Sequence, residues 1–82
     1  MNTIFITGGA GFIGSAVIRF ILKKTSIHVV NIDKLTYAGN LESIPKNLIS
    51  NKYTFEKVDI CDKEKIRDLF KRFQPDSIMH LA

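Results

Sequence analysis

The chain has 82 residues and a net charge of +4, with the 45% hydrophobic and 24% charged content of a small globular domain. Its single cysteine, Cys61, excludes an internal disulfide and fits a reducing compartment, so we expect a cytoplasmic protein. The uncharged segment at residues 1–18 is too short to span a bilayer and is interrupted by glycines and polar side chains. This argues against a membrane anchor or a signal peptide.

A glycine-rich segment lies between an expected strand and an expected helix near the start of the chain. Residues 3–6 are β-branched and aromatic and predict a buried strand, and residues 15–24 predict a helix that ends on two lysines. The glycines fit two spacings, G-x-G-x-x-G at Gly9, Gly11 and Gly14, or G-x-x-G-x-x-G at Gly8, Gly11 and Gly14. Both spacings are typical of a turn that holds phosphates.

The glycines of this segment each have a physical role in a phosphate site. Gly8 permits a tight turn after the strand, Gly11 lets a pyrophosphate approach the backbone, and Gly14 lets the helix pack closely on the sheet. Unpaired N–H groups and partial positive charge at the helix start attract an anion. The alternative is a flexible turn between two core elements. The flanking strand and helix, and an acid at Asp33, favour the phosphate site.

The rest of the chain continues the alternation of strands and helices. The expected elements are strands at residues 27–32, 53–58 and 77–81, one helical turn at 41–44, and a helix that Asp62 caps and that runs to Phe73. This alternation predicts an α/β fold, a Rossmann-type doubly wound parallel sheet in the order 3-2-1-4. The first helix is apolar almost all round, so we expect it to be buried on more than one side.

Three side chains at expected strand ends are candidates for contacts with an adenosine. Asp33 follows Gly14 by 19 residues, where a carboxylate accepts hydrogen bonds from both ribose hydroxyls. A 2′-phosphate would meet like charge there, which favours NAD over NADP, although Lys34 weakens the preference. The alternative for Asp33 is a solvated turn residue. Asp59 and Ile60 either flank the adenine or form a helix-entry loop, and the sequence leaves both open.

Several other features are poor candidates for catalytic, metal or nucleic-acid sites. Tyr53 and Lys57 have the spacing of an acid/base pair on a helix, but on the expected strand they lie about 13 Å apart. Cys61 has no paired base, and His80 lies in an apolar strand, where a core or cleft-lining role is favoured. No Cys/His spacing for a metal site is present. The cations gather at helix ends or alternate with acids, which argues against nucleic-acid binding.

The glycine segment, residues 7–14, resembles the fingerprint of the extended short-chain dehydrogenase/reductases. Residues 33–41, Asp-Lys-Leu-Thr-Tyr-Ala-Gly-Asn-Leu, are more specific and resemble the dTDP-glucose 4,6-dehydratase family, as do residues 58–62 and 79–82. Besides the three glycines Gly8, Gly11 and Gly14, the resemblance implies NAD contacts at Phe12, Ile13, Asp33, Lys34, Leu35, Thr36, Gly39, Asp59, Ile60, Leu81 and Ala82. It also implies dTDP-glucose as the substrate, a place in nucleotide-sugar (dTDP-rhamnose) metabolism, and a homodimer for the complete protein.

The implied reaction is oxidation at sugar C4, loss of water across C5 and C6, and return of the hydride to C6. The family performs it with a Tyr-x-x-x-Lys pair, a Thr and an Asp–Glu pair, all beyond residue 82. We therefore expect residues 1–82 to be the N-terminal part of an NAD-binding Rossmann domain, inactive without the catalytic and sugar-nucleotide-binding part. The alternatives are another sugar-nucleotide epimerase or dehydratase of the same family, or a non-catalytic nucleotide-binding fragment.

Overall fold

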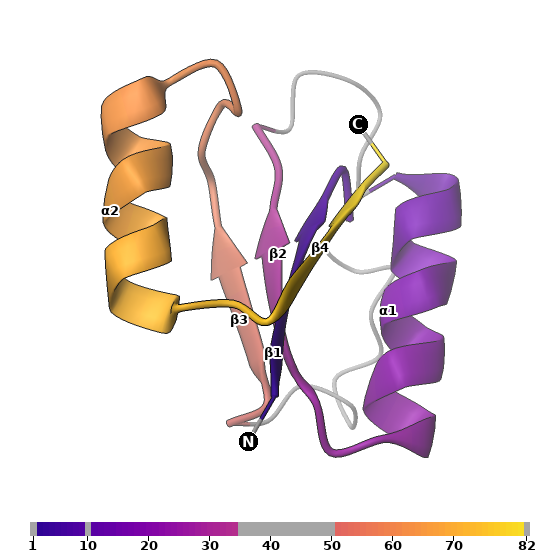
Figure 1. The fold of residues 1–82 in the computed structure, drawn as a ribbon. Coiled ribbons are helices and arrows are strands. Elements are labelled where there is room, and N and C mark those ends of the chain that lie inside the picture. Colours follow the sequence, from indigo (N-terminus) through magenta and orange to yellow (C-terminus); the bar gives the residue numbers. More distant parts are fainter. Residues whose placement is uncertain (1, 10, 35–50, 82) are drawn as a thin grey trace.

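The computed structural model describes residues 2–9, 11–34 and 51–81. The elements in chain order are β1 (Thr3–Thr7), α1 (Phe12–Lys24), β2 (His28–Ile32), β3 (Tyr53–Glu56), α2 (Lys63–Phe73) and β4 (Ser77–His80). The strands pair in parallel in the order β3-β2-β1-β4 (Figure 1). This order confirms the predicted Rossmann-type sheet.

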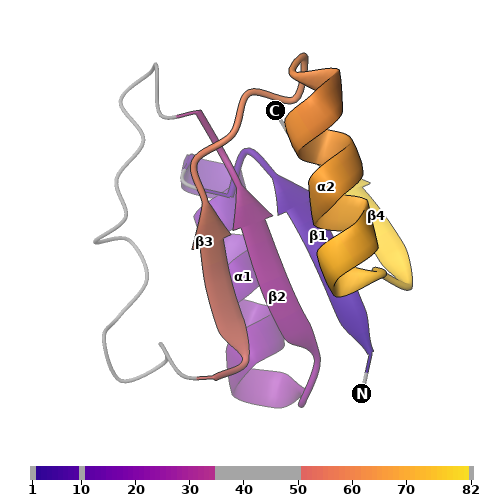
Figure 2. The same ribbon diagram turned by 90° about the vertical axis from the view of Figure 1, so that its left-hand side faces the viewer.

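The two helices cover opposite faces of the sheet and produce three layers (Figure 2). On the α1 face, the buried cluster consists of Ile6, Ile18, Ile21, Leu22 and Val29. On the α2 face, it consists of Phe5, Val30, Ile32, Val58 and Leu69. Because β1 and β2 are covered on both faces, their sequences are nearly continuous runs of apolar residues.

The predicted element boundaries differ from the observed ones by a few residues. Helix α1 begins at Phe12, three residues before the predicted start, because Gly11 has extended backbone and serves as the N-cap without a side-chain bond. Strand β3 ends at Glu56, two residues earlier than predicted. The predicted helical turn at residues 41–44 lies outside the described residues.

Helix α1 is buried on one side only within the described part of the chain. Ile18 is completely buried against the sheet, whereas Phe12, Ile13 and Phe20 are 90%, 67% and 62% exposed. The expectation of burial on several sides is therefore wrong for this part, because the described elements pack only on the sheet-facing side of the helix.

Helix α2 has the cap that the sequence predicted. The Asp62 side chain accepts a hydrogen bond from the Lys65 backbone N–H, at 3.2 Å. We expect Asp62→Ala to lower the free energy of unfolding by about 1 kcal/mol, because that N–H loses its partner. Thermal unfolding followed by circular dichroism measures this. The control is Glu64→Ala, which removes a carboxylate from the same turn but leaves the cap. An equal loss of stability in both variants would show that charge, and not capping, is responsible.

Candidate functional site

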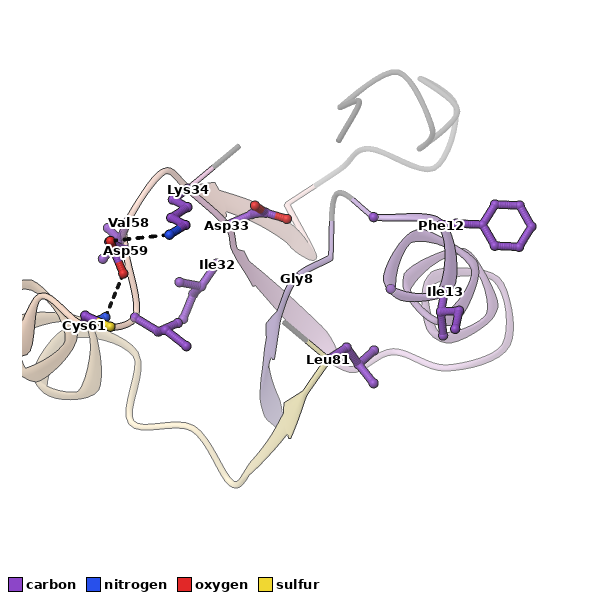
Figure 3. Close-up of a pocket in the computed structure, with 13 residues that line it drawn as sticks. Gly8, Phe12, Ile13, Ile32, Asp33, Lys34, Val58, Asp59, Cys61 and Leu81 are labelled. Carbon is purple, nitrogen blue, oxygen red and sulfur yellow. Dashed lines mark hydrogen bonds and ion pairs between the residues drawn. The ribbon is translucent and has the colours of Figure 1, made fainter. Parts of the chain in front are cut away.

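A hollow of about 570 Å³ lies at the carboxyl ends of β1, β2 and β3, beside the start of α1 (Figure 3). Ligands of parallel α/β sheets bind at this edge, and the volume is in the range of small-molecule sites. The lining residues are Gly8, Gly11, Phe12, Ile13, Gly14, Ile32, Asp33, Lys34, Val58, Asp59, Ile60, Cys61 and Leu81.

The hollow brings together most of the residues that the sequence proposed for cofactor binding. Ten of them line it: Gly8, Gly11, Phe12, Ile13, Gly14, Asp33, Lys34, Asp59, Ile60 and Leu81. Leu35, Thr36, Gly39 and Ala82 lie outside the described residues.

Three lining residues were not predicted: Ile32, Val58 and Cys61. Ile32 and Val58 directly precede the two acids Asp33 and Asp59. Their position at the carboxyl ends of strands was therefore a signal that could have identified them. Cys61 carried no comparable signal.

The glycine turn is built from close backbone contacts. Gly8 has a φ of 75°, in the left-handed region, and this confirms its predicted role in the tight turn. Its N–H donates to the Ile32 carbonyl at 3.0 Å, and its own carbonyl accepts from the Gly11 N–H at 3.1 Å. A Cβ on Gly14 would lie 2.3 Å from the Gly8 carbonyl oxygen. Gly14 therefore permits close packing of α1 against the turn itself.

Gly9 also has a role, which the two possible glycine spacings had left open. A Cβ at this position would lie 2.1 Å from Asn31 Oδ1 and 2.5 Å from Ile18 Cδ1. Gly9 therefore lets the turn pack on a buried side chain of β2 and on α1. The two spacings therefore describe different functions of one turn. Gly8, in the spacing G-x-x-G-x-x-G, forms the bend, and Gly9, in the spacing G-x-G-x-x-G, allows the close packing.

The start of α1 faces the hollow, and the side chains of its own first turn do not offset the partial positive charge of the helix terminus. Its first turn has no acidic side chain, and its N-cap, Gly11, offers no side-chain acceptor. The backbone N–H groups of a first helical turn lack partners within the helix and carry partial positive charge. The glycine turn and this helix start together form a cradle suited to a phosphate or pyrophosphate.

Two carboxylates and one ammonium stand on the opposite wall of the hollow. Asp33 is only 4% exposed at the end of β2, and its N–H donates to the Glu56 carbonyl at 3.2 Å. Lys34 Nζ lies 3.8 Å from Asp59 Oδ2. Figure 3 shows Lys34 directed toward Asp59, whereas the Asp33 carboxylate is directed to the other side.

The Asp59 carboxylate is held in its ionised form. The Cys61 N–H donates to Asp59 Oδ1 at 2.9 Å. This hydrogen bond, with the nearby Lys34 charge, holds the pKa of Asp59 below its usual range. An ionised acceptor therefore stands next to the apolar surface of Val58 and Ile60.

Of the poor candidates from the sequence, Cys61 lines the hollow, whereas Tyr53 and His80 do not. Tyr53 begins β3, at the strand end remote from the hollow, and its hydroxyl accepts a hydrogen bond from Asn31 Nδ2 at 3.1 Å. His80 is exposed, with its Nδ1 2.6 Å from Thr7 Oγ1, so it is not a core residue.

Among the described residues, no group of three His, Cys, Asp or Glu side chains is placed to hold a metal ion. In the same part of the chain, every helix is too short or too polar to cross a membrane.

A family model described as GDP-mannose 4,6 dehydratase matches residues 5–82, almost the whole chain. The chain belongs to this family. The dTDP-glucose 4,6-dehydratase of Salmonella typhimurium is 63% identical over 79 residues, which are 96% of this chain and 22% of that protein. The enzyme of the same name from Neisseria meningitidis is 55% identical, over 100% of this chain and 23% of that protein. The chain thus spans less than a quarter of the length of these curated relatives.

Solved structures of the same fold agree with the family assignment. The chain resembles dTDP-glucose 4,6-dehydratase from Bacillus anthracis in complex with NAD, with a TM-score of 0.93 and 32% identity over 100% of this chain and 27% of that one. It also resembles the UDP-glucose 4-epimerase of Thermus thermophilus in complex with NAD, with a TM-score of 0.80 and 35% identity over 98% of this chain and 24% of that one. These likenesses confirm the resemblance to nucleotide-sugar enzymes and the Rossmann-type sheet.

Proposed function

We propose that the chain forms the part of a dTDP-glucose 4,6-dehydratase that binds the adenosine diphosphate half of NAD. The observation that carries the proposal is the convergence of the glycine turn, the start of α1 and Asp33 on one hollow at the carboxyl edge of the sheet. Curated relatives that are 63% and 55% identical are dTDP-glucose 4,6-dehydratases, which supports this substrate over other nucleotide sugars.

The proposed contacts follow the chemistry of the lining. The turn at Gly8 and Gly11 and the first turn of α1 would hold the pyrophosphate with backbone N–H groups. Asp33 would accept hydrogen bonds from the ribose hydroxyls, and the adenine would lie by Asp59 and Ile60. The further proposed contacts are Phe12, Ile13, Gly14, Lys34, Leu35, Thr36, Gly39, Leu81 and Ala82.

NAD, when bound, supplies a hydride acceptor for sugar C4 and a hydride donor for C6. Oxidation at C4 acidifies C5, so that water can be lost across C5 and C6. In this proposal residues 1–82 bind and orient the cofactor, and the proton-transferring residues lie outside them. We also propose that the complete protein is cytoplasmic and that it forms a homodimer.

Two experiments on the protein, as its gene encodes it, test the proposal. In the first, the protein is titrated with NAD in a calorimeter. In the second, the protein is incubated with dTDP-glucose, and conversion of the sugar nucleotide is assayed. We expect NAD to bind and mass spectrometry to detect the 4-keto-6-deoxy sugar nucleotide, which is lighter than the substrate by one water. Conversion of a sugar nucleotide to a product of equal mass would favour an epimerase, and absence of NAD binding would overturn the proposal.

The pairing of Lys34 with Asp59 predicts a preference for NAD over NADP. Because the Lys34 ammonium is directed toward Asp59, a 2′-phosphate would meet the negative charge of the Asp33 carboxylate. We expect NAD to bind at least about tenfold more tightly than NADP, a difference of about 1.4 kcal/mol.

Asp59→Asn tests the cause of this preference. The variant releases Lys34 from its ion pair. It should therefore lower the ratio of the NADP dissociation constant to the NAD dissociation constant. The control Asp62→Asn changes a carboxylate that is paired with Lys65, outside the hollow. An unchanged ratio in Asp59→Asn would contradict the role given to Lys34.

A further inference from the structure

Asn31 is an unusual residue for its position in the sheet. It lies in β2 on the face that α1 covers and is 0% exposed, like Val29 and Val30 of the same strand. Strands of a parallel sheet covered on both faces are normally apolar. A buried amide also costs about 1–3 kcal/mol for each hydrogen-bonding group that stays unpaired. Its presence therefore calls for a role that an apolar side chain could not perform.

The two ends of the Asn31 amide have different surroundings. Nδ2 donates to the Tyr53 hydroxyl at 3.1 Å. Oδ1 is buried and has no hydrogen-bond donor among the described residues. It faces the glycine turn, since a Cβ on Gly9 would lie 2.1 Å from it. A Cα–Cβ bond is about 1.5 Å long, so the Gly9 Cα is within about 3.6 Å, the range of a Cα–H···O contact.

We infer that Tyr53 and Asn31 are positioning residues for the glycine turn and, through it, for a pyrophosphate. The Tyr53 hydroxyl orients the amide so that its oxygen faces the Gly9 Cα–H. The opposite orientation would press the NH₂ group against that C–H and push the turn outward. The inference rests on the proposed function, because it assumes that the turn binds the pyrophosphate of the cofactor.

The inference also gives Tyr53 a function without catalysis. Burial raises the pKa of the Tyr53 phenol, and the hydrogen bond from Asn31 opposes this only in part. The hydroxyl therefore keeps its proton, and its oxygen accepts the hydrogen bond from the amide. It acts on the hollow from the remote end of β3, through Asn31 and Gly9.

The primary test is Tyr53→Phe, with dissociation constants measured for ADP and for adenosine by calorimetry or by competition with NAD. ADP reports on the glycine turn, whereas adenosine reports only on the ribose and adenine contacts. We expect ADP to bind about 3- to 10-fold more weakly, the effect of one lost neutral hydrogen bond, and adenosine to change less than about twofold.

Thr54→Val is the matched control. It removes the bond between His28 Nε2 and Thr54 Oγ1, at 2.8 Å, which joins the same two strands on the opposite face of the sheet. We expect it to leave the ADP dissociation constant within about twofold of the original value. Equal effects of Tyr53→Phe and Thr54→Val on ADP would overturn the inference. Parallel losses for ADP and adenosine in Tyr53→Phe would do the same, because they would indicate a general loosening.

Asn31→Leu decides the question if Tyr53→Phe does not fold. It removes the buried unpaired oxygen, so we expect an unchanged or higher midpoint of thermal unfolding together with weaker ADP binding. Full ADP affinity in a folded Asn31→Leu protein would overturn the inference. If the original protein binds neither ADP nor NAD, the proposed function fails, whereas ADP binding that is equal in all variants removes only the role of Tyr53 and Asn31.

Discussion

Gly14→Ala is expected to lower the free energy of unfolding by about 1–2 kcal/mol and to abolish NAD binding. The added Cβ would lie 2.3 Å from the Gly8 carbonyl oxygen and 2.8 Å from the Gly9 Cα. Both are backbone atoms, so α1 or the turn must shift as a unit. Overpacking of this kind typically costs about 1–3 kcal/mol, and the cost exceeds the helix preference of about 1 kcal/mol that alanine adds.

The measurement is thermal unfolding by circular dichroism together with an NAD titration. For a domain of this size, each kcal/mol shifts the midpoint by roughly 4–8 °C. The exposed Ala16→Gly in the same helix is the control, since it measures the helix preference without any clash. A Gly14→Ala protein that is as stable as the original and binds NAD would show that the turn adapts to a side chain.

Asp33→Ala is expected to weaken NAD binding by about 10- to 150-fold, equivalent to about 1.5–3 kcal/mol. The side chain is nearly buried at the end of β2 and lines the hollow opposite the glycine turn. A carboxylate there can accept hydrogen bonds from two ribose hydroxyls, and hydrogen bonds to charged groups are the stronger kind.

Calorimetric titration of the folded variant with NAD measures this loss. Asp33→Asn keeps the shape and one acceptor oxygen, so its affinity should lie between those of the original protein and Asp33→Ala. Asp68→Ala, which removes an exposed carboxylate of α2 outside the hollow, is the control for net charge. NAD binding by Asp33→Ala with the original affinity would remove Asp33 from the proposed site.

Local patterns in the sequence were sufficient for the topology and for the edge at which the site lies. Strands that alternate with helices pair in parallel and are joined by right-handed crossovers. The order β3-β2-β1-β4 could therefore be predicted from the order of the elements along the chain. Gly8, Asp33 and Asp59 each follow a predicted strand, and the carboxyl ends of parallel strands share one edge. Their convergence on one hollow needed no knowledge of side-chain packing.

The interactions that give individual residues their roles required the folded chain. Gly9 meets Asn31, and Lys34 meets Asp59, across long intervals of sequence. Such contacts depend on strand register and on the face to which each side chain points, and no local period encodes which distant partner lies opposite. The exposure of Phe12 and Phe20 has the same origin. An apolar composition predicts that a helix is buried, but only the packing of neighbouring elements determines which side of the helix is covered.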